Sequence, residues 1–131
     1  MRSVSVIFLL FISLSACSKQ DSDPVVPVKK VTAYQGISVT GFSGVWNQNT
    51  VQLSFSLSGN LSGVTAIKIF SGNSSNQLCL IGEMTVTGTQ TPATFSYSDA
   101  DPKGSPTYYM LGIEDSQGHL TYLNNILGVS K

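Results

Sequence analysis

The chain has 131 residues, the size of one domain with a short leader, and only 11% of them are charged. Seven basic and seven acidic side chains give a formal net charge of zero, which excludes nucleic-acid binding as a primary role. Arg2 is the only arginine and His119 the only histidine. The chain therefore has few of the side chains that bind phosphate, transfer protons or coordinate metals through imidazole. The composition therefore argues against an enzyme, and we expect no catalytic residue, no cofactor and no resident metal.

The first 16 residues have the features of an export signal. Arg2 supplies a positive charge, and Val4–Leu14 is an apolar run interrupted only by two serines. A bilayer core of about 30 Å needs about 20 apolar residues, so this run has the length of a signal-peptide core rather than of a membrane span.

The run ends in Leu14-Ser15-Ala16-Cys17, which resembles a bacterial lipobox. The resemblance implies cleavage after residue 16 and a thioether-linked diacylglycerol on Cys17, followed by N-acylation in many bacteria. An ordinary secretory signal with an incidental cysteine is the alternative. The next residues, Ser18-Lys19-Gln20-Asp21, resemble the start of Bacteroidetes-type lipoproteins, which implies a lipid anchor in the cell outer membrane. Whether the domain faces the periplasm or the cell surface is left open.

Residues 17–30 are expected to be the lipidated cysteine and a flexible tether. They contain Pro24 and Pro27 and no apolar periodicity, which favours extended polyproline II geometry. The tether leads into a domain expected over residues 31–131.

Apolar and polar residues alternate with a period of two through most of this domain, which predicts β-strands. The clearest case is 51–58, where Val51, Leu53, Phe55 and Leu57 alternate with glutamine and serines. Turn residues separate the expected strands, which are 37–40, 51–58, 65–70, 78–84, 93–97, 108–114 and 119–129. This spacing predicts a single all-β domain, a seven-stranded antiparallel β-sandwich.

Several of these strands together resemble a fibronectin type III domain. Val51–Phe55 resembles its second strand, Ile67–Gly72 its third and Leu78–Gly82 the short strand that follows. Tyr109–Gly118, with the pattern Y-x-L-x-I-x-D and a later glycine, resembles its sixth strand and hairpin, and Asn125-Ile126 matches a pair near its end. The resemblance covers roughly 35–129. Phe55 stands where the family has a core tryptophan, so a related immunoglobulin-like sandwich is the alternative.

The resemblance implies that Tyr109 is a tyrosine-corner residue. Its ring would lie in the core, and its hydroxyl would bond back to a backbone group in the preceding loop. This is a structural role rather than a catalytic one.

Other reactive side chains receive structural interpretations. Because lipidation would use the sulfur of Cys17, we expect no intrachain disulfide. Cys79, which lies between two leucines, is expected to be a small buried hydrophobic residue.

His119 is expected to be an exposed turn residue. Asp99, Asp101 and Asp115 are expected to form turns; weak calcium binding there, if the two acidic segments meet at one pole, is the alternative.

Aromatic residues supply a candidate ligand face made of Trp46, Phe70, Tyr108 and Tyr122. Exposed rings of this kind stack on sugars, whereas buried rings would belong to the core or to cross-strand pairs.

The function that we expect is a non-enzymatic binding or structural module on a cell-envelope lipoprotein. Its partners would be the membrane, through the lipid anchor, and a protein. A small carbohydrate-binding lipoprotein that captures glycans is the alternative, and an enzyme has no support in the spacing of titratable residues.

Overall fold

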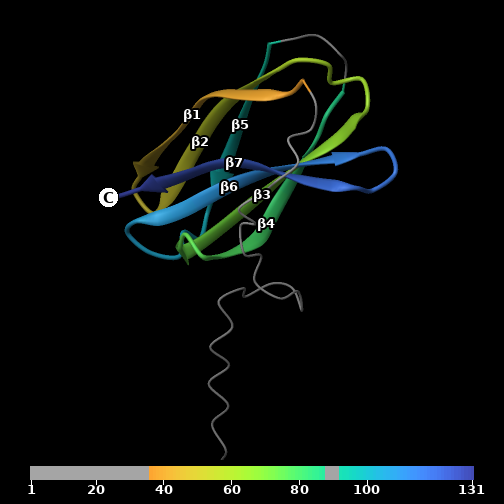
Figure 1. The fold of residues 1–131 in the computed structure, drawn as a ribbon. Coiled ribbons are helices and arrows are strands. Elements are labelled where there is room, and N and C mark those ends of the chain that lie inside the picture. The colour runs from red at the N-terminus through yellow and green to blue at the C-terminus, as the bar shows by residue number, and fades with distance from the viewer. Residues whose placement is uncertain (1–35, 88–91) are drawn as a thin grey trace, which may run out of the picture.

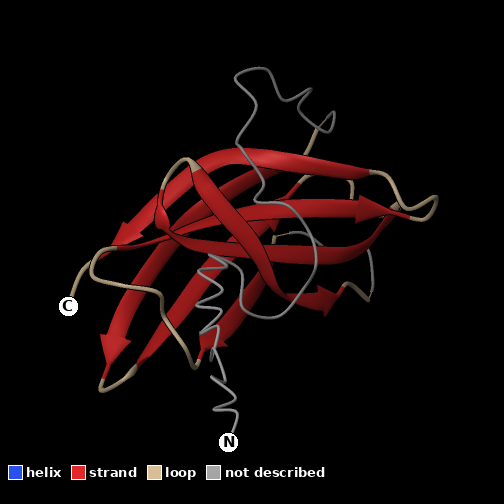
Figure 2. Cartoon of the chain, turned by 90° about the horizontal axis from the view of Figure 1, so that it is seen from below, coloured by secondary structure: helices blue, strands red, loops and turns tan. Residues whose placement is uncertain are grey.

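The computed structural model describes residues 36–87 and 92–131. The strands of these residues are β1 (Ser38–Asn47), β2 (Thr50–Ser58), β3 (Val64–Ser74), β4 (Gln77–Thr85), β5 (Ala93–Asp99), β6 (Thr107–Asp115) and β7 (Leu120–Val129). They form two antiparallel sheets, ordered β1-β2-β5 and β4-β3-β6-β7 (Figure 1). Where they are described, the connections between strands are loops and turns, and the described residues contain no helix (Figure 2). The described chain is therefore an all-β, two-layered fold, as expected.

Parts of the sequence prediction fall outside these ranges. The expected signal peptide (1–16), the tether (17–30) with Cys17, and residues 31–35 of the expected domain lie outside the described residues. Among the residues that are described, no helix is long and apolar enough to cross a membrane.

The core lies between the two sheets and follows the alternation of the sequence. On β2, Val51, Leu53, Phe55 and Leu57 are at most 1% exposed, and the residues between them face outward. On β6, Tyr109, Leu111 and Ile113 are buried in the same core cluster. Burial of such side chains stabilises a fold by about 1.5–3 kcal/mol each, so these two strands carry much of the hydrophobic driving force.

Strand β1 is longer than the sequence predicted. We expected it to end near Thr40, before two glycines, but it continues to Asn47. A bulge between Thr40 and Ser43 includes Gly41, whose φ of 64° is accessible to glycine at little cost. At Gly44 a Cβ would lie 2.6 Å from Val129 Cγ2, so the absence of a side chain lets β7 approach β1.

An aromatic side chain joins the two sheets at each flank of the sandwich. On one flank, Trp46 Nε1 of β1 donates to the carbonyl oxygen of Val129 on β7 at 3.1 Å. On the other flank, the Tyr97 hydroxyl of β5 donates to the carbonyl oxygen of Ile81 on β4 at 3.3 Å. A side chain at Gly82 would overlap the Tyr97 ring, so this glycine makes room for the second bond. Each flank thus has a hydrogen bond that connects the two sheets.

Candidate functional site

Tyr109 lies fully buried in the core and pairs with Asp99 at the end of β5. Its hydroxyl donates to Asp99 Oδ2 at 2.7 Å, and Asp99 Oδ1 accepts the amide hydrogen of Asp101 at 3.0 Å. We expected a backbone group as the partner of this hydroxyl, and that expectation was wrong. A carboxylate takes the place because Asp99 points inward at the last position of its strand, where it is 6% exposed.

The surroundings keep the Tyr109 phenol protonated. Burial raises the pKa of Tyr109 far above its ordinary value, and the hydrogen bond to the Asp99 carboxylate raises the pKa further. The phenol therefore remains a donor. Nearby, Thr107 Oγ1 accepts the amide hydrogen of Gly104 at 3.1 Å and its hydroxyl donates to the carbonyl oxygen of the same residue. These bonds hold the connection between β5 and β6.

The acidic segments do not meet at one pole. Asp99 and Asp101 precede β6, whereas Asp115 ends it, and nine extended residues separate the two ends of that strand by about 26 Å. Asp101 pairs with Lys103 at 2.8 Å. In the described part of the chain no group of three or more His, Cys, Asp or Glu side chains is arranged to hold a metal ion. The arrangement on which the calcium alternative depended is therefore contradicted.

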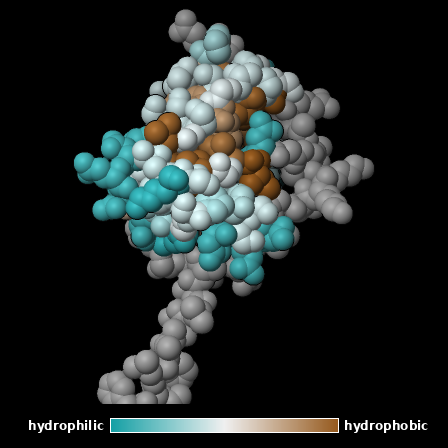
Figure 3. Space-filling view, turned by 90° about the vertical axis from the view of Figure 1, so that its left-hand side faces the viewer, coloured by the Kyte–Doolittle hydropathy of each residue, from teal (hydrophilic) through white to brown (hydrophobic). Residues whose placement is uncertain are grey.

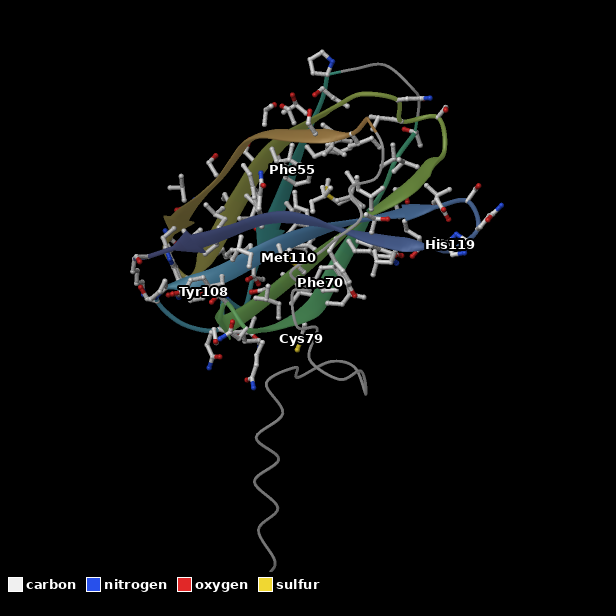
Figure 4. All side chains as sticks on the ribbon, viewed as in Figure 1. Phe55, Phe70, Cys79, Tyr108, Met110 and His119 are labelled. Atoms are coloured by element: carbon white, nitrogen blue, oxygen red, sulfur yellow. The ribbon has the colours of Figure 1, made fainter. Side chains whose placement is uncertain are left out.

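Asp115 instead organises the turn between β6 and β7. Its Oδ1 accepts the amide hydrogens of Gln117 and His119, each at 2.9 Å, and its Oδ2 lies 3.3 Å from His119 Nδ1. These bonds, led by the one from the His119 amide, lower the pKa of Asp115. His119 is exposed at the tip of this turn, away from the other labelled side chains (Figure 4). Both residues shape a loop, as the sequence suggested.

A second hydrophobic cluster lies on the outer face of the β4-β3-β6-β7 sheet. Along β3 and β6, Phe70 and Met110 alternate with the core residues Ile69 and Leu111 and therefore point away from the core. They lie on the other side of these strands from Phe55 (Figure 4). We call this group the outer-face cluster; its members are Phe70, Leu78 and Met110, with Leu80, Tyr108 and Tyr122 packed against them.

Three of the four aromatic residues predicted as a ligand face come together in this cluster. The rings of Phe70 and Tyr122 meet edge to face at 5.4 Å between centroids. Phe70 is only 2% exposed and so presents no open ring face, whereas Tyr108 and Tyr122 are half-buried. Trp46 is not part of the group: it packs against the main core from β1, and Lys131 Nζ lies 5.3 Å from its ring centroid.

Charged residues border the outer-face cluster. Lys68 on β3 pairs with Glu83 on β4 and, at 3.2 Å, with Glu114 on β6. The bond to Glu83 raises the pKa of Lys68 more than burial lowers it, so the amine stays charged. Two carboxylates share one ammonium group here, which leaves the border with an excess negative charge.

Other hydrophobic surface is limited. Among the described residues Val45, Leu120 and Ile126 are large hydrophobic side chains with substantial exposure, at 65%, 37% and 39%. Ile126 is the cross-strand partner of Met110, so it continues the outer face onto β7. On the side that carries the C-terminus, the hydrophobic surface is a narrow band bordered by hydrophilic residues (Figure 3).

Cys79 differs from the prediction. It is buried, as expected of a small hydrophobe, but it is disulfide-bonded, and the other sulfur lies outside the described residues. The expectation of no intrachain disulfide rested on lipidation of Cys17, which is the only other cysteine in the sequence. A disulfide and a thioether-linked lipid exclude each other at one sulfur, so the two chemistries make opposite predictions for Cys17.

Sequence reasoning missed the non-aromatic members of the outer-face cluster, Leu78, Leu80 and Met110, and the Asp99–Tyr109 pair. The cluster had a signal: Ile69-Phe70 and Tyr108–Leu111 are consecutive apolar residues, which indicates a strand with both faces covered. The pair had none, because a carboxylate ten residues upstream has no fixed position until the loop between them is folded.

Comparison with known protein families found no family whose model matches this chain, and a search of curated proteins found no similar sequence.

Proposed function

We propose that the chain is a lipoprotein of the cell envelope, anchored in the outer membrane through Cys17, whose fibronectin type III-like domain is a non-enzymatic binding or structural module. The anchor rests on the lipobox-like Leu14–Cys17. The observation that carries the domain type is the position of β4, which pairs with β3 in the sheet that also holds β6 and β7. In a constant-type immunoglobulin domain the fourth strand joins the first sheet instead.

The use of the ionisable side chains supports a non-enzymatic role. Asp99, Asp115 and Lys68 are each engaged by groups that fix a strand end, a turn or a cross-strand pair. Catalysis by acid–base chemistry needs at least two such groups converging on a space where a substrate fits. Here the bonds of these groups serve the fold.

The anchor is tested by mass spectrometry of the chain extracted from membranes. The expected result is a mature chain that begins at Cys17 and carries the mass of a diacylglycerol, with a further acyl chain where N-acylation occurs. A Cys17→Ser variant is expected to leave the membrane fraction. Recovery of a Cys17–Cys79 disulfide peptide with no lipid would overturn the anchor.

The binding role is tested by crosslinking on intact cells, followed by identification of captured proteins. Capture of a defined protein by the wild-type chain, lost in a variant with altered surface residues but an unchanged melting temperature, supports a binding module. Absence of any partner in the crosslinked fraction would contradict binding and leave the structural role.

Glycan capture is the second candidate, and one observation favours it: Tyr108 and Tyr122 lie half-buried on one outer face. Binding to a glycan array that is lost in Tyr122→Ala and kept in Tyr97→Phe would replace the first candidate with this one. Equal binding by both variants would exclude this face as the glycan site.

A further inference from the structure

Strand β5 is a sheet edge without the features that keep other edges from pairing. The edges formed by the described strands are β1 and β5 of one sheet and β4 and β7 of the other. The pairings of β1, β4 and β7 each contain a register shift, which distorts the edge that a new strand would meet. Strand β5 pairs with β2 in unbroken register, and its exposed residues carry no charge. A regular, uncharged edge of this kind is open to another strand.

The backbone groups of alternate β5 residues point toward this open edge. A two-residue loop joins β1 to β2, so its flanking residues, Asn47 and Thr50, form a hydrogen-bonded pair of the ladder. Because Thr50 faces β1, the next residue and every second one after it, which are the buried residues of β2, face β5. Their partners are the inward-pointing residues of β5. The amide and carbonyl groups of Thr94, Ser96 and Ser98 therefore point away from β2.

Side chains at the same edge leave apolar surface uncovered. Phe95 and Tyr97 point inward and pack against the main core, yet both are only half-buried. Their cross-strand partners on β2, Phe55 and Leu53, are each 1% exposed. Strand β2 has a neighbour on both sides and β5 has one on a single side. A further strand beside β5 would therefore cover these two rings.

We propose that β5 pairs antiparallel with β5 of a second copy of this chain, about a twofold axis at Ser96. In this register Ser96 lies opposite Ser96 of the second copy and exchanges both backbone hydrogen bonds with it. Thr94 and Ser98 lie opposite each other on the exposed face, and Phe95 and Tyr97 lie opposite each other on the inner face. Hydroxyls thus meet hydroxyls and rings meet rings.

A second copy is the occupant that the pairing of β2 with β5 favours. The same combinations already join these strands: Ser56 shares a hydrogen bond with Thr94 at 3.0 Å, and the rings of Phe55 and Phe95 stack at 5.5 Å between centroids. A second copy also brings identical charges to the interface. The exposed residues of β5 have none, so self-pairing meets no repulsion, whereas the edge strand β4 carries Glu83.

The dimer joins two three-stranded sheets into one continuous sheet. Because the paired strands run in opposite directions, the amino-terminal ends of the two domains lie at opposite ends of the dimer. The inference does not depend on the proposed function. With both copies anchored in one membrane, however, the arrangement favours strands that lie along the membrane surface, since upright strands would direct one amino-terminal end away from it.

The first test follows backbone amide exchange by NMR in the mature chain, purified in detergent, at increasing protein concentration. The amides of Thr94, Ser96 and Ser98 are expected to exchange more slowly by about tenfold or more as the dimer forms. The amides of Phe95 and Tyr97 face β2 and serve as internal controls, which are expected to change little. Exchange at the three edge amides that is independent of concentration would overturn the proposal.

Substitutions at the edge supply the second test. Ser96→Pro removes the central edge amide hydrogen, and Ser96→Lys places two ammonium groups opposite each other on the dimer axis. Each is expected to raise the dimer dissociation constant by about tenfold or more. The matched controls keep the wild-type constant: Ser96→Thr retains the amide and the hydroxyl, and Ser54→Lys puts the same charge on the exposed cross-strand partner, one strand away from the edge.

Sedimentation equilibrium in density-matched detergent measures the association, and urea denaturation verifies that each variant is folded. A wild-type chain that remains monomeric at about 100 μM would overturn the proposal. Persistence of the dimer in both Ser96→Pro and Ser96→Lys would do the same, because the copies would then associate through another surface. If one of these variants does not fold, the other and the amide exchange decide. A complex with a different protein that is lost in Ser96→Lys, without any dimer, would assign the edge to that protein instead.

Discussion

Tyr109 and Asp99 form a hydrogen bond of 2.7 Å between a fully buried phenol and a nearly buried carboxylate, across the loop that joins β5 to β6. The pair links the sheet containing β5 to the sheet containing β6 at one pole of the sandwich. Because the carboxylate also accepts the amide hydrogen of Asp101, one side chain orders both the loop and the contact between sheets.

Removal of the phenol hydroxyl is expected to destabilise the domain. Tyr109→Phe leaves the Asp99 carboxylate short of a donor in a buried position, which costs about 1–3 kcal/mol of the free energy of unfolding. Urea denaturation measures the change, and Tyr108→Phe, on a half-buried neighbour that faces outward, is expected to change it by less than about 0.5 kcal/mol. Equal midpoints for Tyr109→Phe and the wild type would show that the bond contributes nothing.

Stability is expected to fall at alkaline pH through the same residue. The pKa of Tyr109 is raised in the folded state, so the unfolded chain releases this proton first as pH rises above about 10. The contribution is fully present below that value and is lost as the pH increases toward the folded pKa. Chemical denaturation between about pH 8 and 11 should show a steeper loss for the wild type than for Tyr109→Phe. Parallel curves would contradict the shift.

Two glycines with positive φ are expected to differ in their tolerance of alanine. Gly118, at φ 82°, has open space where a Cβ would lie, so Gly118→Ala should cost only the backbone strain, about 1 kcal/mol. Gly59, at φ 114°, faces the carbonyl oxygen of Gly36, which a Cβ would overlap. We expect Gly59→Ala to cost about 3 kcal/mol or more, or to prevent folding. Similar melting temperatures for both variants would show that the chain near Gly36 yields easily.

The turn between β6 and β7 is expected to weaken in acid. The pKa of Asp115 is lowered in the folded state, so its contribution is complete above the unfolded value of about 4 and is lost as pH falls through the folded pKa. Asp115→Ala should therefore be less stable than the wild type at neutral pH, and the difference should shrink in acid. Asp115→Asn, which keeps an acceptor oxygen but does not titrate, is the control. A difference that stays constant from neutral to acid pH would refute the assignment.

The sequence was most informative where one face of a strand is polar. On β2, glutamine and serines alternate with Val51, Leu53, Phe55 and Leu57, so both the strand and its buried side could be read directly. The predicted first strand ended too early because glycines often mark the end of a strand. In the structure β1 continues through a bulge at Gly41, and that bulge depends on the pairing of β1 with β2.

The candidate site was less predictable for a similar reason. Local sequence identifies an aromatic residue but not the sheet face that it shares with others. Phe70, Tyr108 and Tyr122 meet only through the pairing of β3, β6 and β7, and the same pairing leaves Trp46 on the other sheet. The Asp99 carboxylate likewise reaches Tyr109 through a contact between sheets, which no short-range pattern encodes.

The hydrogen bonds donated by Trp46 and Tyr97 at the two flanks also bear on aggregation between copies of the molecule. Strand-by-strand aggregation begins when a foreign amide hydrogen finds a vacant carbonyl at a sheet margin. At Val129 and Ile81 that carbonyl already holds an indole or phenol hydrogen from the same molecule. An added strand could use that carbonyl only by displacing the aromatic side chain, so this one position on each flank is protected against pairing with another chain.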